Sequence, residues 1–369
     1  MVTPSRKRIV LIGPFLPFRG GIAQHTTMLY RAMRELVDVR AISFSKQYPA
    51  WLFPGASDRD PAYEGYREDG VEYVLNSLNP LSWSRALRKC KEYMPVRVVI
   101  PWWTVYWAPC FWYLARGFRR SGIRVVYFCH NVVEHESSFW KRWLTKRVLR
   151  EGEEFVVHTR VDKENLLAFL PQADVRIQAH PIYAQFPRPK GVLPRRAKLE
   201  LLFFGFVRPY KGLDNLIEAL GMVKGADVFL TIAGEFWEGE ASARKRIDEL
   251  GLSDKVEIVP NYLTDDQVAE HFSRADIVVL PYRSATGSGV VPLAYHYCKP
   301  VIVTEVGGLP DVVEDGRTGF VVPRDRPREL AAAIEKMTPE VIATMKTAIE
   351  SKKQELTWEA LAEAVTSGI

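Results

Sequence analysis

Short runs of β-branched and other apolar residues alternate with helical patterns along almost the whole chain. This alternation is typical of parallel sheets whose strands are connected by crossover helices. The predicted strands are residues 8–13, 39–44, 71–75, 96–101 and 124–130 in the first half, and 199–205, 228–234, 256–260, 277–281 and 301–304 in the second. Two such series predict two doubly wound α/β domains.

A proline-rich segment separates the two series. Residues 179–194 contain four prolines, which fit neither a sheet nor a helix interior. A chain of 369 residues also exceeds the size at which a single core keeps growing. We therefore expect an N-terminal domain over residues 1–182, a C-terminal domain over 195–345, and terminal helices over 346–369 that could pack back on the first domain.

The segment that follows the strand at 199–205 carries two cations. Gly205 is followed by Arg208 and Lys211, and an amphipathic helix comes next. Ligands of open α/β sheets bind beyond the carboxyl ends of the strands. An arginine can hold a diphosphate through two hydrogen bonds, and a lysine can neutralise the charge of a leaving group. The alternative is a solvated basic loop.

A loop of small residues follows the strand at 277–281. Gly287 and Gly289 allow backbone N–H groups to approach an anion, and the helix expected to begin near Val290 adds partial positive charge. We expect Thr286, Gly287, Ser288, Gly289 and Val290, together with Gly205, to bind the donor. A tight turn without a ligand is the alternative.

A third candidate anion site follows the first strand. Gly20 and Gly21 open a loop before a helix that should begin near Ile22, so backbone amides converge there. Arg19 could add charge to this site or lie on the surface.

These segments together resemble the retaining glycosyltransferases of the GT-B fold, the large family often called group 1. The matching pieces are Gly205 with Arg208 and Lys211, then residues 281–289, 300–302 and 307–319. The resemblance implies two facing Rossmann-like domains with a cleft between them. It also implies transfer of a sugar from a nucleotide diphosphate to an acceptor, without a metal ion or other cofactor.

One departure from the family concerns a spaced pair of glutamates that contact the sugar and the ribose in most members. Ala285 and Leu293 stand at those two positions. Related enzymes with a Ser-Gly-Val loop lack the pair. We expect Thr286, Ser288 and backbone amides to replace it.

Several other polar residues are candidates. His130, at the end of a strand, could hydrogen-bond the sugar or the acceptor, or be structural; His135 and His25 are weaker candidates of the same kind. Glu235 and Asp311 are assigned no catalytic role. Asp58-Arg59-Asp60 resembles a metal-binding triplet but is expected far from the phosphate loops, so no metal site is predicted.

Charge is distributed unevenly along the chain. Residues 1–185 carry 27 Lys and Arg against 17 Asp and Glu, whereas residues 186–369 carry 23 against 27. The four cysteines are scattered, which indicates a reducing compartment and no structural zinc. No apolar run is long enough to span a membrane. We therefore expect a cytoplasmic protein.

Aromatic and basic residues are mixed in segments 101–120 and 139–150 of the first half. This mixture suits a membrane interface, and hence the inner face of the membrane and a lipid-linked acceptor; a carbohydrate acceptor is equally compatible. Core packing in the first segment and a solvated helix in the second are the alternatives.

Two other functions remain open at this stage. A sugar-nucleotide epimerase of the GT-B fold would form product without an acceptor, and a nucleotide-sugar-binding protein would have lost transfer activity. Nucleic acid is not expected as a partner, because no recognition motif accompanies the positive charge.

Overall fold

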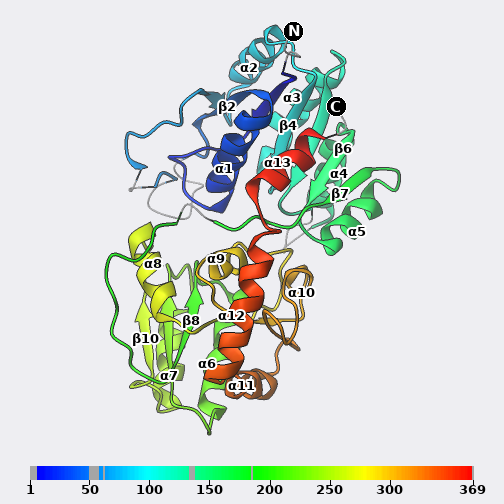
Figure 1. The fold of residues 1–369 in the computed structure, drawn as a ribbon. Coiled ribbons are helices and arrows are strands. Elements are labelled where there is room, and N and C mark those ends of the chain that lie inside the picture. Colours follow the sequence, from blue (N-terminus) through cyan, green and yellow to red (C-terminus); the bar gives the residue numbers. More distant parts are fainter. Residues whose placement is uncertain (1–5, 50–57, 61–62, 133–137, 184–185, 368–369) are drawn as a thin grey trace. The chain divides into compact units, whose positions relative to one another are not determined.

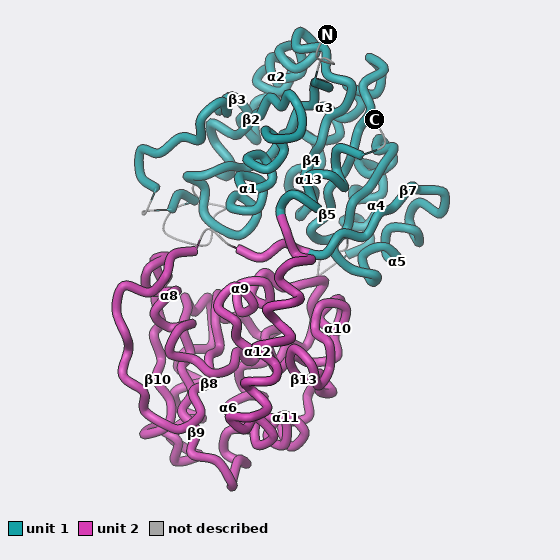
Figure 2. The backbone as a smooth tube through the Cα atoms, in the orientation of Figure 1, with its two compact units in different colours: residues 1–179, 358–369 teal, residues 180–357 magenta. Residues whose placement is uncertain are grey.

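The computed structural model describes residues 6–49, 58–60, 63–132, 138–183 and 186–367 (Figure 1). The chain forms two compact units (Figure 2). Unit 1 consists of Met1–Ala179 together with Trp358–Ile369, and unit 2 is His180–Thr357.

Unit 1 is built on a seven-stranded parallel sheet in the order β3-β2-β1-β4-β5-β6-β7. Its strands are β1 Arg8–Ile12, β2 Asp38–Lys46, β3 Val71–Asn76, β4 Arg97–Trp102, β5 Arg124–Cys129, β6 Glu154–Val157 and β7 Asp174–Ile177. Its helices are α1 Gly21–Leu36, α2 Pro80–Glu92, η2 Val105–Trp107, α3 Ala108–Arg119, α4 Phe139–Leu149, α5 Arg160–Phe169 and α13 Trp358–Thr366. Helix α1 packs on α13, whereas α3 contacts both α2 and α4.

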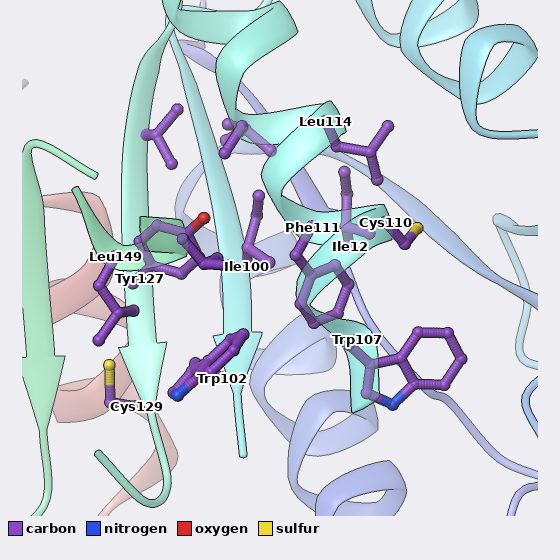
Figure 3. Packing of buried hydrophobic residues seen from close by; sticks show 14 of the residues in the cluster. Ile12, Ile100, Trp102, Trp107, Cys110, Phe111, Leu114, Tyr127, Cys129 and Leu149 are labelled. Carbon is purple, nitrogen blue, oxygen red and sulfur yellow. The ribbon is translucent and has the colours of Figure 1, made fainter. Parts of the chain in front are cut away.

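One core cluster of unit 1 contains residues of the sheet and of α3, whereas buried residues such as Leu29 of α1 and Leu361 of α13 lie outside it. Figure 3 shows Ile12 and Ile100 of the sheet beside Phe111 of α3, and Tyr127 of the sheet beside Leu149 of α4. Trp102 and Trp107 belong to the same cluster and are each 1% exposed. Of the two open interpretations of segment 101–120, core packing therefore describes Trp102 and Trp107, whereas Trp103 and Trp112 are partly buried and pack against the same cluster.

Unit 2 is built on a six-stranded parallel sheet in the order β10-β9-β8-β11-β12-β13. Its strands are β8 Leu199–Phe204, β9 Val228–Ala233, β10 Val256–Val259, β11 Ile277–Leu280, β12 Val301–Thr304 and β13 Gly319–Val322. Its helices are η3 Pro209–Lys211, α6 Leu213–Met222, α7 Glu240–Glu249, α8 Asp265–Arg274, α9 Val290–His296, α10 Leu309–Val312, α11 Pro327–Glu335 and α12 Pro339–Lys353.

The prediction of two doubly wound α/β domains is confirmed by these two sheets. The structure divides the chain at slightly different points from the sequence pattern. Helix α12 belongs to unit 2, because Ile342 and Met345 pack into its core. Only α13 joins unit 1, through its contacts with α1. Part of the proline-rich segment is held by unit 2, where His296 and Tyr297 hydrogen-bond the carbonyls of Phe186 and Pro187.

Candidate active site

Strand order reverses between β1 and β4 in unit 1, and between β8 and β11 in unit 2. Open α/β sheets bind ligands at such a point, beyond the carboxyl ends of the strands. The loop with Arg208 and Lys211 follows β8, and the loop with Thr286 follows β11. The predicted donor residues of the second half therefore lie at the switch point of unit 2.

Lys211 is a buried cation at this edge. The residue is 8% exposed, and its Nζ atom lies 5.4 Å from the centre of the Tyr282 ring. A Cβ atom built on Gly205 would come 3.0 Å from the same Nζ, so the ammonium group lies against the end of β8. Burial lowers the pKa of Lys211. Within the described parts of the chain, no carboxylate forms an ion pair with it.

Backbone packing fixes the position of this lysine. Gly212, with φ +64°, lies so close to the loop after β11 that an added Cβ would be 2.1 Å from the Pro281 carbonyl oxygen. The Arg283 N–H donates to the Tyr210 carbonyl at 2.7 Å. The loops after β8 and β11 therefore form one rigid piece around Lys211.

Arg283, on the same edge of the sheet, is a cation whose charge is neutralised by carboxylates of the protein itself. Its guanidinium binds Asp214 through two hydrogen bonds of 2.8 and 2.7 Å and also binds Asp325 at 2.7 Å. The hydrogen bond from Asp214 raises the pKa of Arg283. Its charge is compensated within unit 2, which distinguishes it from Lys211.

Arg208 lies on an aromatic surface that the sequence interpretation missed. Its guanidinium carbon is 4.6 Å from the centre of the Trp237 ring. Phe206 lies 5.1 Å from Trp237 and 6.3 Å from Tyr262 between ring centres. These three rings follow β8, β9 and β10. The sequence could have indicated this aromatic surface, since each of the three rings comes just after a predicted strand.

The loop between β11 and α9 packs tightly against its neighbours. Thr286 is buried, and its carbonyl accepts a 3.0 Å hydrogen bond from the Gly308 N–H. Gly307, with φ +52°, touches the loop so closely that an added Cβ would be 1.5 Å from the Ala285 oxygen. Ser288 Oγ accepts from the Val290 N–H at 3.2 Å.

The helix after this loop begins at Val290, as predicted, but α9 is only seven residues long. Its contribution to anion binding is therefore weaker than that of a full helix, and the loop amides matter more. Gly287 and Gly289 are exposed. Ala285 and Leu293, at the positions of the family's glutamates, are 8% and 4% exposed.

In unit 1 the first glycine-rich loop has the predicted form. Gly20 has φ +98° and caps α1, which begins at Gly21. One expectation is wrong: the triplet Asp58-Arg59-Asp60 is not remote from this loop. The Arg19 N–H donates to the Asp58 carbonyl at 2.9 Å, and the Asp60 N–H donates to the Pro17 carbonyl at 2.8 Å. The triplet supports the loop through backbone hydrogen bonds. These contacts could not be predicted because the two segments are far apart in the sequence.

His130 follows β5 and lies in a cluster of three histidines. Its ring centre is 4.5 Å from that of His25 on α1 and 5.7 Å from that of His158, which follows β6. His158 Nδ1 lies 2.9 Å from the Gln178 carbonyl oxygen. One ring nitrogen from each histidine lies within 4.8 Å of the others, close enough for the three to hold a metal ion. His158 was missed because β6 was not predicted. The expectation of no metal stays a prediction.

The remaining polar candidates are Glu235, Asp311 and His135. The Glu235 carbonyl accepts from the Val207 N–H at 2.9 Å, which joins the loops after β8 and β9. Asp311 lies in the first turn of α10. His135, with Glu134 and Glu136, lies outside the described residues.

Two surface hollows of unit 1 lie away from these residues. They flank the amino ends of β1, β4 and β5, and residues such as Arg8, Met94 and Arg124 line them. Because ligands of such sheets bind at the opposite edge, we do not assign a substrate to these hollows.

No helix in the described ranges has both the length and the apolar character needed to cross a bilayer.

Comparison with known proteins gives a consistent result. The family described as "Glycosyl transferases group 1" matches residues 189–356, and the one described as "Glycosyltransferase Family 4" matches residues 19–184. The D-inositol 3-phosphate glycosyltransferase of Paenarthrobacter aurescens is 29% identical over 197 residues, which cover 52% of this chain and 47% of the relative. The chain spans about half the length of the curated relatives it matches.

Solved structures share the fold over almost the whole chain. Sucrose-phosphate synthase from Thermosynechococcus elongatus has a TM-score of 0.72 at 18% identity, covering 97% of both chains. HepE of Anabaena in complex with UDP has a TM-score of 0.73 at 16% identity, covering 97% of this chain and 98% of that one. The two family matches follow one another along the chain, and its two parallel sheets agree with these structures. The chain therefore belongs to the group 1 glycosyltransferases, with the GT-B fold.

Proposed function

We propose that the protein transfers a hexosyl residue from a nucleotide diphosphate sugar to an acceptor hydroxyl, with retention of anomeric configuration. The observation that carries this proposal is the buried Lys211 ammonium group, which has no carboxylate partner among the described residues and lies at the switch point of unit 2. A buried lysine that is uncompensated in the free protein is suited to an anionic ligand.

The donor is assigned to unit 2. Lys211 and Arg208 would neutralise the diphosphate, and the N–H groups of residues 286–290 would hydrogen-bond its oxygens. Trp237 adds a further donor, since its Nε1 is buried and has no hydrogen-bond partner in the described part of the chain. The Anabaena protein of the same fold was solved with UDP, which supports a nucleotide diphosphate as the leaving group.

In the proposed reaction the bond between the anomeric carbon and the diphosphate oxygen breaks as the acceptor oxygen attacks from the same face. The departing phosphate takes the acceptor's proton, so the products are the glycoside and the nucleoside diphosphate. Lys211 and Arg208 stabilise the charge that grows on the leaving oxygen. Within unit 1, we assign the amides of Gly20 and Gly21 to a phosphate group and the ring of His130 to a sugar or acceptor hydroxyl.

The acceptor is a carbohydrate or a lipid-linked molecule, which places the reaction in surface polysaccharide or glycolipid synthesis. The excess of Lys and Arg over Asp and Glu in residues 1–185 supports an anionic or membrane-bound acceptor. Action in the cytoplasm, at the inner face of the membrane, is part of the same proposal.

The experiment is a thermal-shift screen against UDP-, GDP- and ADP-sugars, followed by assay of nucleoside diphosphate release with and without acceptors. We expect one class of nucleotide sugar to raise the melting temperature, because it binds only the folded state. Release should require an acceptor and persist after EDTA treatment.

Each alternative gives a different result. A changed sugar nucleotide without any acceptor would indicate an epimerase, and binding without turnover would indicate a binding protein. A flat response to every nucleotide sugar would contradict the proposal.

A further inference from the structure

Helix α4 presents an exposed aromatic face. Phe139, Trp140 and Trp143 are 87%, 56% and 57% exposed. Residues three and four apart are neighbours on a helix surface, so these three side chains form one patch, here called the α4 face. Exposure distinguishes them from Trp102 and Trp107 of the other aromatic segment, which are each 1% exposed.

The α4 face is surrounded by positive charge. The helix sequence from Phe139 to Leu149 contains Lys141, Arg142, Lys146 and Arg147 and no acidic residue. Among the described residues, Arg142 and Arg147 contact aromatic rings, those of Phe169 and Trp112, and form no ion pair. On neighbouring α3, by contrast, Arg116 and Arg119 are both paired with Glu151.

This combination fits an anionic lipid bilayer. Tryptophan and phenylalanine enter the boundary between headgroups and acyl chains, while lysine and arginine remain at the anionic headgroups. A protein partner would need an apolar and acidic surface that matches the shape of the α4 face. The bilayer needs only the mixture of exposed rings and cations that α4 displays.

The place of α4 in the fold connects this surface with the proposed chemistry. Helix α4 follows β5, so its first turn, with Phe139 and Trp140, lies on the side of the carboxyl edge of the sheet. His130, the candidate sugar or acceptor ligand, follows the same strand. A bilayer bound by α4 would therefore hold a lipid-linked acceptor near the edge of unit 1 that carries the candidate acceptor residues.

We propose that the α4 face docks the protein on an anionic membrane by inserting Phe139, Trp140 and Trp143 among the lipids. Docking itself is independent of the proposed transfer reaction; only the delivery of a lipid-linked acceptor rests on that function.

Co-sedimentation of the full chain with vesicles tests this proposal without any sugar donor. Vesicles of phosphatidylcholine alone are compared with vesicles that also contain phosphatidylglycerol. We expect binding to the anionic vesicles and little binding to the neutral ones. The triple variant Phe139→Ser/Trp140→Ser/Trp143→Ser should bind them roughly 10-fold more weakly or worse. Lys146→Gln/Arg147→Gln should lose about fivefold per cation removed.

Two controls separate docking from folding and from donor binding. Val192→Ser removes another exposed apolar side chain, 96% exposed in unit 2, and should leave vesicle binding unchanged. The α4 variants should keep the wild-type melting temperature and the wild-type thermal shift with nucleotide sugars.

Absence of binding to anionic vesicles would overturn the proposal, as would equal binding by the triple variant. Binding to an oligonucleotide that is lost in the same variants, without vesicle binding, would identify nucleic acid as the occupant instead. If nucleotide sugars do not raise the melting temperature of the wild-type protein, that result would count against the transfer function but not against membrane docking.

Discussion

At the scale of single residues, the two cations that the sequence interpretation placed together have different environments. Lys211 is buried against β8 and the Tyr282 ring, whereas Arg208 lies half-buried over Trp237. Burial of an ammonium group without a carboxylate is unfavourable in the free protein. The sequence order showed that both follow a strand, but it could not show which of them is buried.

Replacing Lys211 with Met should separate function from stability. We expect turnover to fall by roughly 100-fold or more, because the leaving group loses its buried cation. The melting temperature should stay equal or rise, because the cost of burying the charge disappears. Steady-state kinetics and calorimetry check both. Lys224→Met, at an exposed lysine after α6, is the control; a marked loss of stability in Lys211→Met would contradict this account.

The direction of the Lys211 pKa shift also predicts a pH dependence. Burial lowers its pKa below the ordinary 10.5, so the protonated form is lost at a lower pH than in an exposed lysine. Turnover should therefore fall as pH rises through that lowered pKa. Between it and 10.5 the unfolded chain binds more protons, so Lys211 makes stability increase with pH there.

The pH–rate profile checks this sign. Lys211→Arg, if it retains turnover, should lose the alkaline decline, because arginine stays charged. An unchanged alkaline limb in that variant would assign the decline to another group.

Gly307 tests the packing of the donor loop. Alanine there needs an unfavourable φ of +52° and would bring its Cβ to 1.5 Å from the Ala285 oxygen, so the loop must move. We expect Gly307→Ala to weaken binding of the nucleotide sugar at least tenfold. Gly225→Ala, where an added Cβ meets nothing within 4 Å, should bind normally. Titration of both variants with the same donor gives the answer.

At the scale of elements, the ten predicted strands are all present, each within a run rich in β-branched or other apolar residues. The missed strands β6, β7 and β13 have four residues each, but so do the predicted strands β10, β11 and β12, so length alone does not explain the omissions. β7 is the clearest case: two of its four residues, Asp174 and Arg176, are charged, so no apolar run marks it. His158 was not identified as a candidate because β6 was not predicted, and a residue can be assigned to a strand end only when the strand itself is recognised.

The association of α13 with unit 1 depends on buried charge that the sequence did not reveal. Arg97 is 1% exposed, binds both oxygens of Glu154 at 3.0 and 2.8 Å, and donates to the Val365 and Ser367 carbonyls. It thereby satisfies carbonyl groups at the end of α13, which a helix cannot satisfy itself.

Replacing Arg97 with Met should destabilise the protein by about 3 kcal/mol, because the buried Glu154 carboxylate would keep only its 3.4 Å contacts with Arg124 and Arg176, and the Val365 carbonyl would lose its Arg97 hydrogen bond. Arg124→Met is the control: Arg124 also contacts Glu154, at 3.4 Å, but its side chain is 50% exposed, so a cost below about 1 kcal/mol is expected. Urea denaturation compares the two. Equal costs would show that the buried interaction does not anchor α13.

At the scale of the whole molecule, both units repeat one design: a parallel sheet whose order reverses beside the strand that precedes the candidate phosphate loop. The two family matches divide the chain in the same way, one to each unit. Sequence patterns were enough to predict this architecture, because each strand and the loop after it are recognised from residues that are neighbours in the chain. The aromatic surface at Trp237 and the histidine cluster assemble residues from separate segments of the chain, and their contacts are set only by folding.

The most direct test of the central claim, that Arg208 and Lys211 bind the diphosphate of the donor, is calorimetric titration. The nucleoside diphosphate that gives the largest thermal shift is titrated into wild-type protein and into the Arg208→Ala/Lys211→Met variant. The account predicts that the dissociation constant rises about 100-fold or more in the variant, from the loss of two charge-assisted contacts. Wild-type affinity in a folded variant would contradict it.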